Sequence, residues 1–211
     1  MATASALQKA RASYTPKLPK SLAQHGPFAQ VKEGEKTEPS ADQDALKQRF
    51  PNTYGLPMAS ITSESSGDEA TPLKVGVILS GGQAPGGHNV IAGLYDAIKA
   101  AHPDSELYGF LGGPSGLVEN DYCVLTGDII DRYRNTGGFD IIGSGRTKLE
   151  KQEQFEKVAA TCRENGINGV AIVGGDDSNT NACMLAEYFE ENNIDIQVIG
   201  CPKTIDGDLK N

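Results

Sequence analysis

Hydrophobic residues divide this chain into two parts. Up to residue 72 they follow no regular spacing, whereas from Leu73 onward short apolar runs alternate with segments of helical periodicity. The runs that predict β-strands lie at 75–79, 107–111, 140–142, 169–173 and 196–200. Regular alternation of strands and helices with short loops predicts an α/β fold, in which a parallel sheet is covered by helices on both faces.

Three helices are predicted by apolar residues that recur at i, i+3, i+4 and i+7. These stripes are Ile91, Leu94, Tyr95 and Ile98; Phe155, Val158, Ala159 and Cys162; and Ala182, Leu185, Ala186 and Phe189. A shorter helix is expected to open near Thr126. In such a Rossmann-like sheet, ligands bind at the carboxyl ends of the strands.

The first 72 residues are expected to form an extension and linker, and residues 73–211 an α/β lobe. Residues 1–32 carry a charge of +5 but contain one arginine and early prolines, a composition that fits a transit peptide poorly. We expect an extension that wraps the lobe, with a helix near Asp42–Phe50 and a flexible connector at Ser60–Thr71.

Charge and composition exclude several functional classes. The net charge of −9 argues against nucleic-acid binding, and no apolar run approaches the length of a membrane span. The four cysteines form no C-x-x-C pair, and Cys162 and Cys183 fall on predicted apolar helix faces. A reduced, cytoplasmic protein is expected.

The turn between the fourth strand and its helix carries the most chemistry. It reads Gly-Gly-Asp-Asp-Ser-Asn-Thr over residues 174–180. A helix N-terminus favours an anion such as phosphate, but Asp176 and Asp177 would repel one. Mg²⁺ held between carboxylate and phosphate resolves this conflict. The alternative is that the glycines only make a tight turn and that Asp177 or Ser178 caps the helix.

The first strand ends in a glycine-rich loop, Ser80–His88. Its glycines allow backbone to approach a phosphate closely. Gly87 stands where a Walker A loop needs lysine, and the G-x-G-x-x-G spacing is absent, so neither a P-loop NTPase nor an NAD enzyme is indicated. His88 could contact phosphate or could be a local hydrogen-bonding residue.

Two further turns follow the third and fifth predicted strands. Gly143-Ser-Gly-Arg146 places a guanidinium where it could clamp a phosphoryl group, although a surface arginine is the simpler reading. In Pro202–Asp208, two carboxylates stand two residues apart and would share a side of an extended segment. One could take a hydroxyl proton while the other orients a metal or the base.

These turns together resemble the ordered motifs of the phosphofructokinase family, specifically its pyrophosphate-dependent members. The resemblance covers roughly residues 73–211, and four motifs in order are more specific than any one of them. It implies reversible phosphoryl transfer, with Mg²⁺, from pyrophosphate to the 1-hydroxyl of fructose 6-phosphate in glycolysis. It also implies a homo-oligomer when full length.

The resemblance assigns roles to individual residues. Asp206 matches the general base, Thr204 a substrate-holding hydroxyl, and Asp208 and Asp176 groups near the metal and the transferring phosphoryl group. The donor contacts that it implies are Gly82, Arg146, Asp177 and Lys203. ATP-using relatives carry glycine at the position of Asp177, so this carboxylate implies selection against a nucleotide.

Two alternatives stay open: a non-catalytic phosphate-binding or regulatory subunit, and an ATP-dependent 6-phosphofructokinase. An NAD or lipid kinase is disfavoured by Thr204-Ile-Asp-Gly-Asp208. The family continues well beyond the position of Asn211, with a second lobe that supplies most sugar-phosphate contacts. These 211 residues are therefore expected to be a fragment that does not turn over alone.

Overall fold

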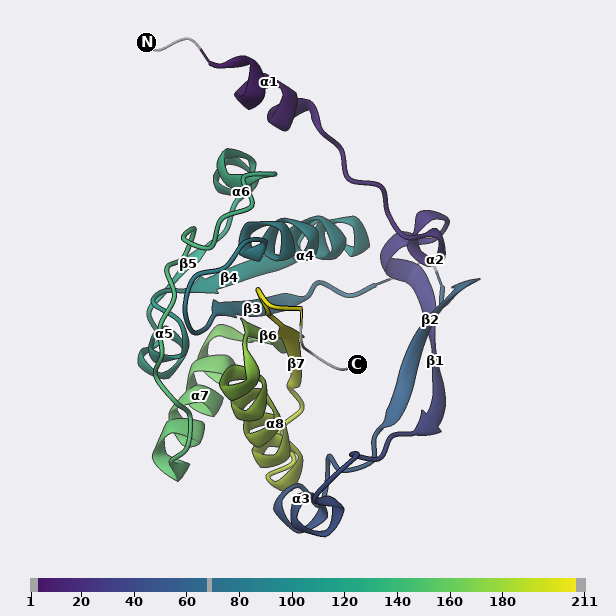
Figure 1. Cartoon of the computed structure of the whole chain (residues 1–211), viewed down its shortest axis with the longest axis vertical. Coiled ribbons are helices and arrows are strands. Elements are labelled where there is room, and N and C mark those ends of the chain that lie inside the picture. Colours follow the sequence, from purple (N-terminus) through teal and green to yellow (C-terminus); the bar gives the residue numbers. More distant parts are fainter. Residues whose placement is uncertain (1–3, 68–69, 208–211) are drawn as a thin grey trace.

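The centre of the molecule is a five-stranded sheet in the order β5-β4-β3-β6-β7 (Figure 1). The computed structural model describes residues 4–67 and 70–207. Four strands run parallel, namely β3 (Lys74–Leu79), β4 (Glu106–Phe110), β6 (Gly169–Gly174) and β7 (Gln197–Pro202). The predicted α/β fold is confirmed.

Helices cover both faces of this sheet, because its strands carry apolar residues on both sides. On one face, α5 (Pro114–Glu119), α7 (Gln152–Asn165) and α8 (Asp176–Glu191) pack over residues such as Ile78 and Ile172. On the other, α4 (Gly87–Ala101) and α6 (Gly127–Tyr133) pack over residues such as Leu79 and Val173. The predicted helices are all present, but Cys183 is exposed rather than buried.

The strand predicted at 140–142 is wrong. The backbone N–H groups of Asp140 and Ile141 donate to the His88 ring, and the Ile142 carbonyl accepts from Gly112. These groups are therefore not free to join the sheet. Its edge is instead β5 (Tyr122–Val124), a strand too short to show a pattern in the sequence, which pairs antiparallel with β4.

The N-terminal extension has more regular structure than its sequence predicts. It contains α1 (Ala6–Ser13), α2 (Lys20–Ala23), a 3-10 turn η1 (Gly26–Phe28) and α3 (Gln43–Arg49), the last close to the helix predicted near Asp42. A two-stranded antiparallel ribbon joins β1 (Ala29–Lys36) to β2 (Pro57–Ser65). The predicted connector is therefore wrong over Ser60–Ser65.

Two sets of hydrogen bonds tie this extension to the lobe. The side chain of Asn135 donates to the carbonyls of Arg11 and Tyr14. On the opposite side, the Glu187 carboxylate of α8 accepts from Asn52 and Thr53. Figure 1 shows the extension running past the sheet from α1 at one end to α3 beside α8 at the other. Within 4–67 and 70–207, no helix combines the length and apolarity that crossing a membrane requires.

Candidate functional site

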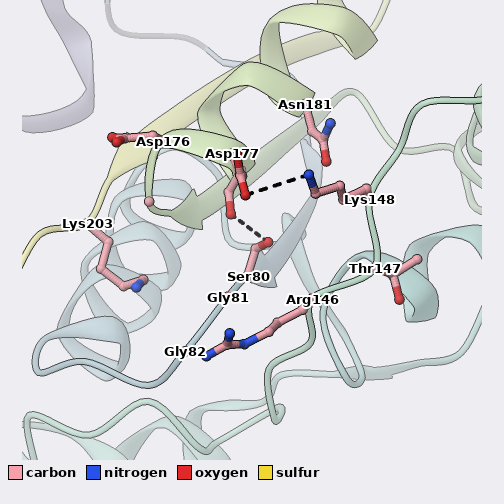
Figure 2. A pocket seen from close by; sticks show the side chains of 12 residues that line it. Ser80, Gly81, Gly82, Arg146, Thr147, Lys148, Asp176, Asp177, Asn181 and Lys203 are labelled. Carbon is pink, nitrogen blue, oxygen red and sulfur yellow. Dashed lines mark hydrogen bonds and ion pairs between the residues drawn. The ribbon is translucent and has the colours of Figure 1, made fainter.

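A pocket of about 570 Å³ opens at the carboxyl ends of β3, β6 and β7. In this sheet, β3 has β4 on one side and β6 on the other. The connections that follow β3 and β6 therefore run in opposite directions, which leaves a crevice between them at the carboxyl ends of the strands. Loops after β3 and β6, the segment before α7, and the residue after β7 supply its wall (Figure 2). The lining residues are Ser80, Gly81, Gly82, Arg146, Thr147, Lys148, Gly175, Asp176, Asp177, Ser178, Asn181 and Lys203.

The base of the pocket is a close contact between the end of β3 and the first turn of α8. Ser178 donates a hydrogen bond to Ser80 across 2.8 Å, and both side chains are buried. A β-carbon at Gly174 would lie only 2.4 Å from the β-carbon of Ser178. Glycine at this position therefore lets the helix begin directly on the sheet edge.

Two exposed carboxylates stand on the first turn of α8. Asp177 faces the segment before α7, with its Oδ2 3.9 Å from Lys148 Nζ. Asp176 lies on the other side of the turn (Figure 2). The residue that caps the helix is Gly175, without a side-chain hydrogen bond. Neither Asp177 nor Ser178 serves as the cap, so the capping role considered for these two residues is wrong.

Three cationic side chains border the pocket, those of Arg146, Lys148 and Lys203. Arg146 Nη2 lies 3.2 Å from the position of a β-carbon at Gly82, so glycine leaves room for the guanidinium beside the loop. Lys203 Nζ lies 3.9 Å from the corresponding position at Gly81. The backbone N–H of Lys203 donates to the Gly174 carbonyl across 2.9 Å, which fixes this lysine beside the start of α8.

The wall that carries Arg146 and Lys148 is anchored to α8 by a buried amide. Asn181 accepts from the Leu149 N–H across 3.0 Å and donates to the Leu149 carbonyl across 3.1 Å. Leu149 itself is fully buried. Because one side chain satisfies both backbone groups, the segment before α7 is held at a defined distance from the carboxylates.

Sequence reasoning missed Lys148 and Asn181 as members of the site. Helical spacing points to Asn181, which stands four residues after Asp177 on the same face of α8, whereas Lys148 lies in an irregular segment to which no spacing rule applies. The predicted donor residues Gly82, Arg146, Asp177 and Lys203 all line the pocket, as does Asp176. Their chemical roles stay predictions.

The predicted catalytic segment lies beyond β7, outside the lining of this pocket. Thr204 Oγ1 accepts from the Gly207 N–H across 3.1 Å, and Asp206 is exposed. With this turn and a positive φ at Gly207, the segment bends rather than running extended. Asp208 lies outside the described residues, so the shared side predicted for Asp206 and Asp208 stays a prediction.

Within the part of the chain that the structure describes, no group of three His, Cys, Asp or Glu residues forms a ready metal cage. Mg²⁺ does not need one, because it is commonly held by one or two carboxylates together with substrate phosphates. Exposed oxygen donors from Asp176 and Asp177 border a pocket lined with cations. The donor chemistry therefore fits Mg²⁺ that arrives with a phosphate ligand.

Two curated relatives of this chain carry the same activity in their names. The chain is 59% identical over 98% of its length to pyrophosphate--fructose 6-phosphate 1-phosphotransferase of Porphyromonas gingivalis. It is 47% identical, over the same share, to the beta subunit of the enzyme of that name from Solanum tuberosum. The chain spans 37% and 36% of these two proteins.

A solved structure shows the same likeness in three dimensions. The pyrophosphate-dependent phosphofructokinase of Marinobacter aquaeolei matches 65% of this chain and 35% of its own, with a TM-score of 0.55 and 25% sequence identity. The family model described as phosphofructokinase matches residues 74–211, which carry every strand of the central sheet and every residue of the pocket. On this evidence the chain belongs to the phosphofructokinase family.

Proposed function

We propose that this chain forms the phosphoryl-donor half of a pyrophosphate-dependent phosphofructokinase. The reaction is the reversible transfer of a phosphoryl group from pyrophosphate to the 1-hydroxyl of fructose 6-phosphate. One observation carries the proposal: a glycine-rich loop, three cations and Asp177 meet in one pocket at a helix N-terminus. The names of the relatives support the same substrates.

The pocket offers pyrophosphate three kinds of donor. Backbone at Gly82 borders the pocket without a side chain of its own, whereas the Gly81 N–H already donates to the Gly145 carbonyl. Arg146 can donate through two nitrogens of its planar fork, whereas Lys148 and Lys203 supply point charges. Phosphoryl transfer is accelerated mainly by positioning and by neutralising charge, which this arrangement can provide.

Mg²⁺ is part of the proposal, with Asp176 as its protein ligand. When bound, the ion would neutralise phosphate charge and help to align the phosphoryl group for in-line transfer. Asp176 suits this role because its carboxylate is exposed at the rim of the pocket and turned away from Lys148 (Figure 2). Asp208 is proposed as a second carboxylate close to the transferring group.

On the acceptor side, Asp206 is proposed to take the proton from the sugar hydroxyl. A general base must reach that proton, and an exposed carboxylate after β7 has the freedom to do so once a substrate is present. Thr204 is proposed to hold the substrate beside it. Lys203, immediately before, links this segment to the donor pocket.

Donor selection is assigned to Asp177. Its carboxylate borders the pocket opposite Lys148, so a nucleotide that extends beyond its β-phosphate would place a further negative charge near it. Pyrophosphate ends before that point. An ATP-dependent activity is thus disfavoured, and no observation favours a non-catalytic subunit, because Asp206 and the pocket cations are all present.

We further propose a role in glycolysis, a cytoplasmic location and assembly of the complete protein into a homo-oligomer. The cysteine usage and the relatives' names support the first two. The third rests on the family resemblance alone.

Donor choice is tested by Asp177→Gly in the complete protein, assayed with pyrophosphate and with ATP. We expect wild type to use pyrophosphate, and the variant to lose pyrophosphate turnover and to gain use of ATP. Asp128→Gly is the matched control, because Asp128 is also an exposed acid in the first turn of a helix, α6, away from the pocket. Preference of the wild type for ATP would refute the proposal.

A further inference from the structure

His88 is buried behind the glycine-rich loop rather than facing the pocket. Its side chain is 3% exposed and packs edge-on against Tyr133 of α6, with ring centroids 5.0 Å apart. Both ring nitrogens are engaged by the segment 136–141. The phosphate contact considered from the sequence is therefore wrong, and the local hydrogen-bonding role is what the structure shows.

The partners of the two ring nitrogens favour one protonation state of His88. Thr136 Oγ1 donates to the Tyr133 carbonyl, so it is free to accept from His88 Nδ1–H. His88 Nε2 lies 2.9 Å from the Asp140 N–H and 3.0 Å from the Ile141 N–H, and both of these donate to it. Neutral imidazole with its proton on Nδ1 satisfies the Thr136 hydroxyl and both N–H groups at once, and it leaves Asp140 Oδ1, 2.9 Å from Nε2, without a hydrogen from the ring.

Backbone hydrogen bonds also join segment 136–146 to the glycine-rich loop. Gly86 N–H donates to the Gly137 carbonyl across 2.9 Å, and His88 N–H to the Gly138 carbonyl across 3.0 Å. Farther along, Gly81 N–H donates to the Gly145 carbonyl across 2.8 Å. The next residue after Gly145 is Arg146, so this hydrogen bond fixes the backbone directly before a cation of the pocket.

The same segment also supports Lys203. The Phe139 ring lies 5.7 Å from Lys203 Nζ, within the range of a cation–π contact. A β-carbon at Gly87 would lie 2.3 Å from this ring, and one at Gly138 would lie 2.5 Å from the imidazole of His88. Glycine at both positions allows the loop and the segment to pack without a gap.

We propose that His88 is a positioning residue for the donor site: as neutral Nδ1–H imidazole it holds segment 136–146 against the glycine-rich loop and so places Arg146 and Lys203. Its effect on pyrophosphate rests on the proposed function. The placement of the segment does not.

Protonation of His88 should undo this arrangement. A proton on Nε2 would point at two N–H donors, while Asp140 Oδ1, 2.9 Å from Nε2, would attract the imidazolium and offer it a competing partner. Asp140 and Tyr133 are the titratable groups in contact with the ring among the described residues. Burial lowers the pKa of His88, and Asp140 opposes this in part.

Two substitutions of His88 and one control separate the contributions of the two ring nitrogens. His88→Gln places an amide oxygen near the position of Nε2, where it can accept from the two N–H groups. His88→Asn keeps a partner for Thr136 but removes the acceptor of those two part-buried N–H groups. His102→Gln is the control, because His102 lies at the far end of α4 and is partly exposed.

Isothermal titration at neutral pH measures pyrophosphate affinity with Mg²⁺ present. We expect His88→Asn to weaken binding by about tenfold, because the two part-buried N–H groups that hold the segment lose their acceptor, and His88→Gln to retain most of the affinity. As pH falls below about 6.5, the ordinary value from which the pKa of His88 is lowered, wild type should weaken relative to His88→Gln, because only wild type has the titrating ring. Equal loss in both variants, or parallel pH profiles, would overturn the inference.

Hydrogen exchange tests the placement without a ligand. His88→Asn should accelerate exchange of the amides of Gly81, Asp140 and Ile141, whereas His88→Gln and His102→Gln should not. Long-range proton–nitrogen NMR of the imidazole should show the proton on Nδ1. Unchanged exchange in His88→Asn, or a proton on Nε2 at neutral pH, refutes the inference even if pyrophosphate binds. Failure of wild type to bind pyrophosphate, with the exchange result as expected, refutes the proposed function instead.

Discussion

The hydroxyl of Ser178 donates to the hydroxyl of Ser80 across 2.8 Å and joins the first turn of α8 to the end of β3. Ser80 is 5% exposed and Ser178 is 7% exposed, so water does not readily replace either partner. The two walls of the pocket that come from different βα units are therefore locked together at their base.

Removal of this contact should destabilise the lobe. Ser178→Ala leaves the Ser80 hydroxyl buried without its donor, at a cost of about 1 to 3 kcal/mol. Urea denaturation followed by circular dichroism measures the difference. Ser60→Ala, an exposed serine on β2, should change the stability by less than about 0.5 kcal/mol. Equal stability of Ser178→Ala and wild type would show that this hydrogen bond is not a determinant of the fold.

Two glycines should respond to alanine in opposite directions. A β-carbon at Gly145 would lie 2.0 Å from the Gly112 carbonyl oxygen, so Gly145→Ala must displace backbone next to Arg146. Gly93 is exposed within α4 and has open space around it, so Gly93→Ala should stabilise by about 0.5 to 1 kcal/mol. Thermal melting of both variants checks the contrast, which fails if Gly145→Ala melts at or above the wild-type temperature.

Glu187 should make stability depend on acidity. Burial raises its pKa, but hydrogen bonds from the backbone and side chains of Asn52 and Thr53 outweigh this and lower the pKa below 4.5. The carboxylate therefore contributes stability above its unfolded pKa, and this contribution is lost as pH falls through the lower folded value.

Glu187→Gln should accordingly weaken the attachment of the extension. Hydrogen bonds to a charged group contribute about 1.5 to 3 kcal/mol, and we expect a loss of that order together with faster limited proteolysis near Asn52. The variant should also lose part of the stability change between about pH 6 and about pH 3. Glu191→Gln, at an exposed position of the same helix, is the control. Identical proteolysis of all three proteins would contradict the role of Glu187.

Substitution of the proposed base tests the acceptor side. In the complete protein, Asp206→Ser should reduce kcat by roughly 10² or more while donor affinity changes little. Steady-state kinetics with pyrophosphate and titration of pyrophosphate binding separate the two effects. Near-normal turnover would remove Asp206 as the base.

Sequence periodicity was sufficient for the elements that bury a complete stripe or run. Ile91 and Ile98 on α4, and Leu185 and Phe189 on α8, are buried because the sheet accepts their whole apolar face. The strand prediction at 140–142 was wrong for a reason that periodicity does not detect. Its apolar residues pack on the core, as a strand's would, but its N–H groups are taken by His88, and such a contact between residues about 50 positions apart leaves no local pattern.

The site was predictable where a motif gives both residue type and position. Gly82, Asp177 and Lys203 follow β3, β6 and β7, and parallel topology brings the ends of these strands to one edge, where the segment that carries Arg146 also lies. Asn181 belongs to no such motif, and its role depends on a pair of hydrogen bonds to Leu149. The bend at Gly207 also depends on local side-chain bonding, which periodicity does not report.

The tie between Glu187 and the extension has a thermodynamic consequence for the pocket. The helix that offers its first turn to a ligand is the same helix that holds Asn52 and Thr53 near its other end. A ligand that binds only the folded helix adds its binding free energy to the cost of any opening that unfolds this helix. Occupation of the pocket should therefore protect the distant extension from those openings in which α8 itself unfolds, without any movement of the backbone between them.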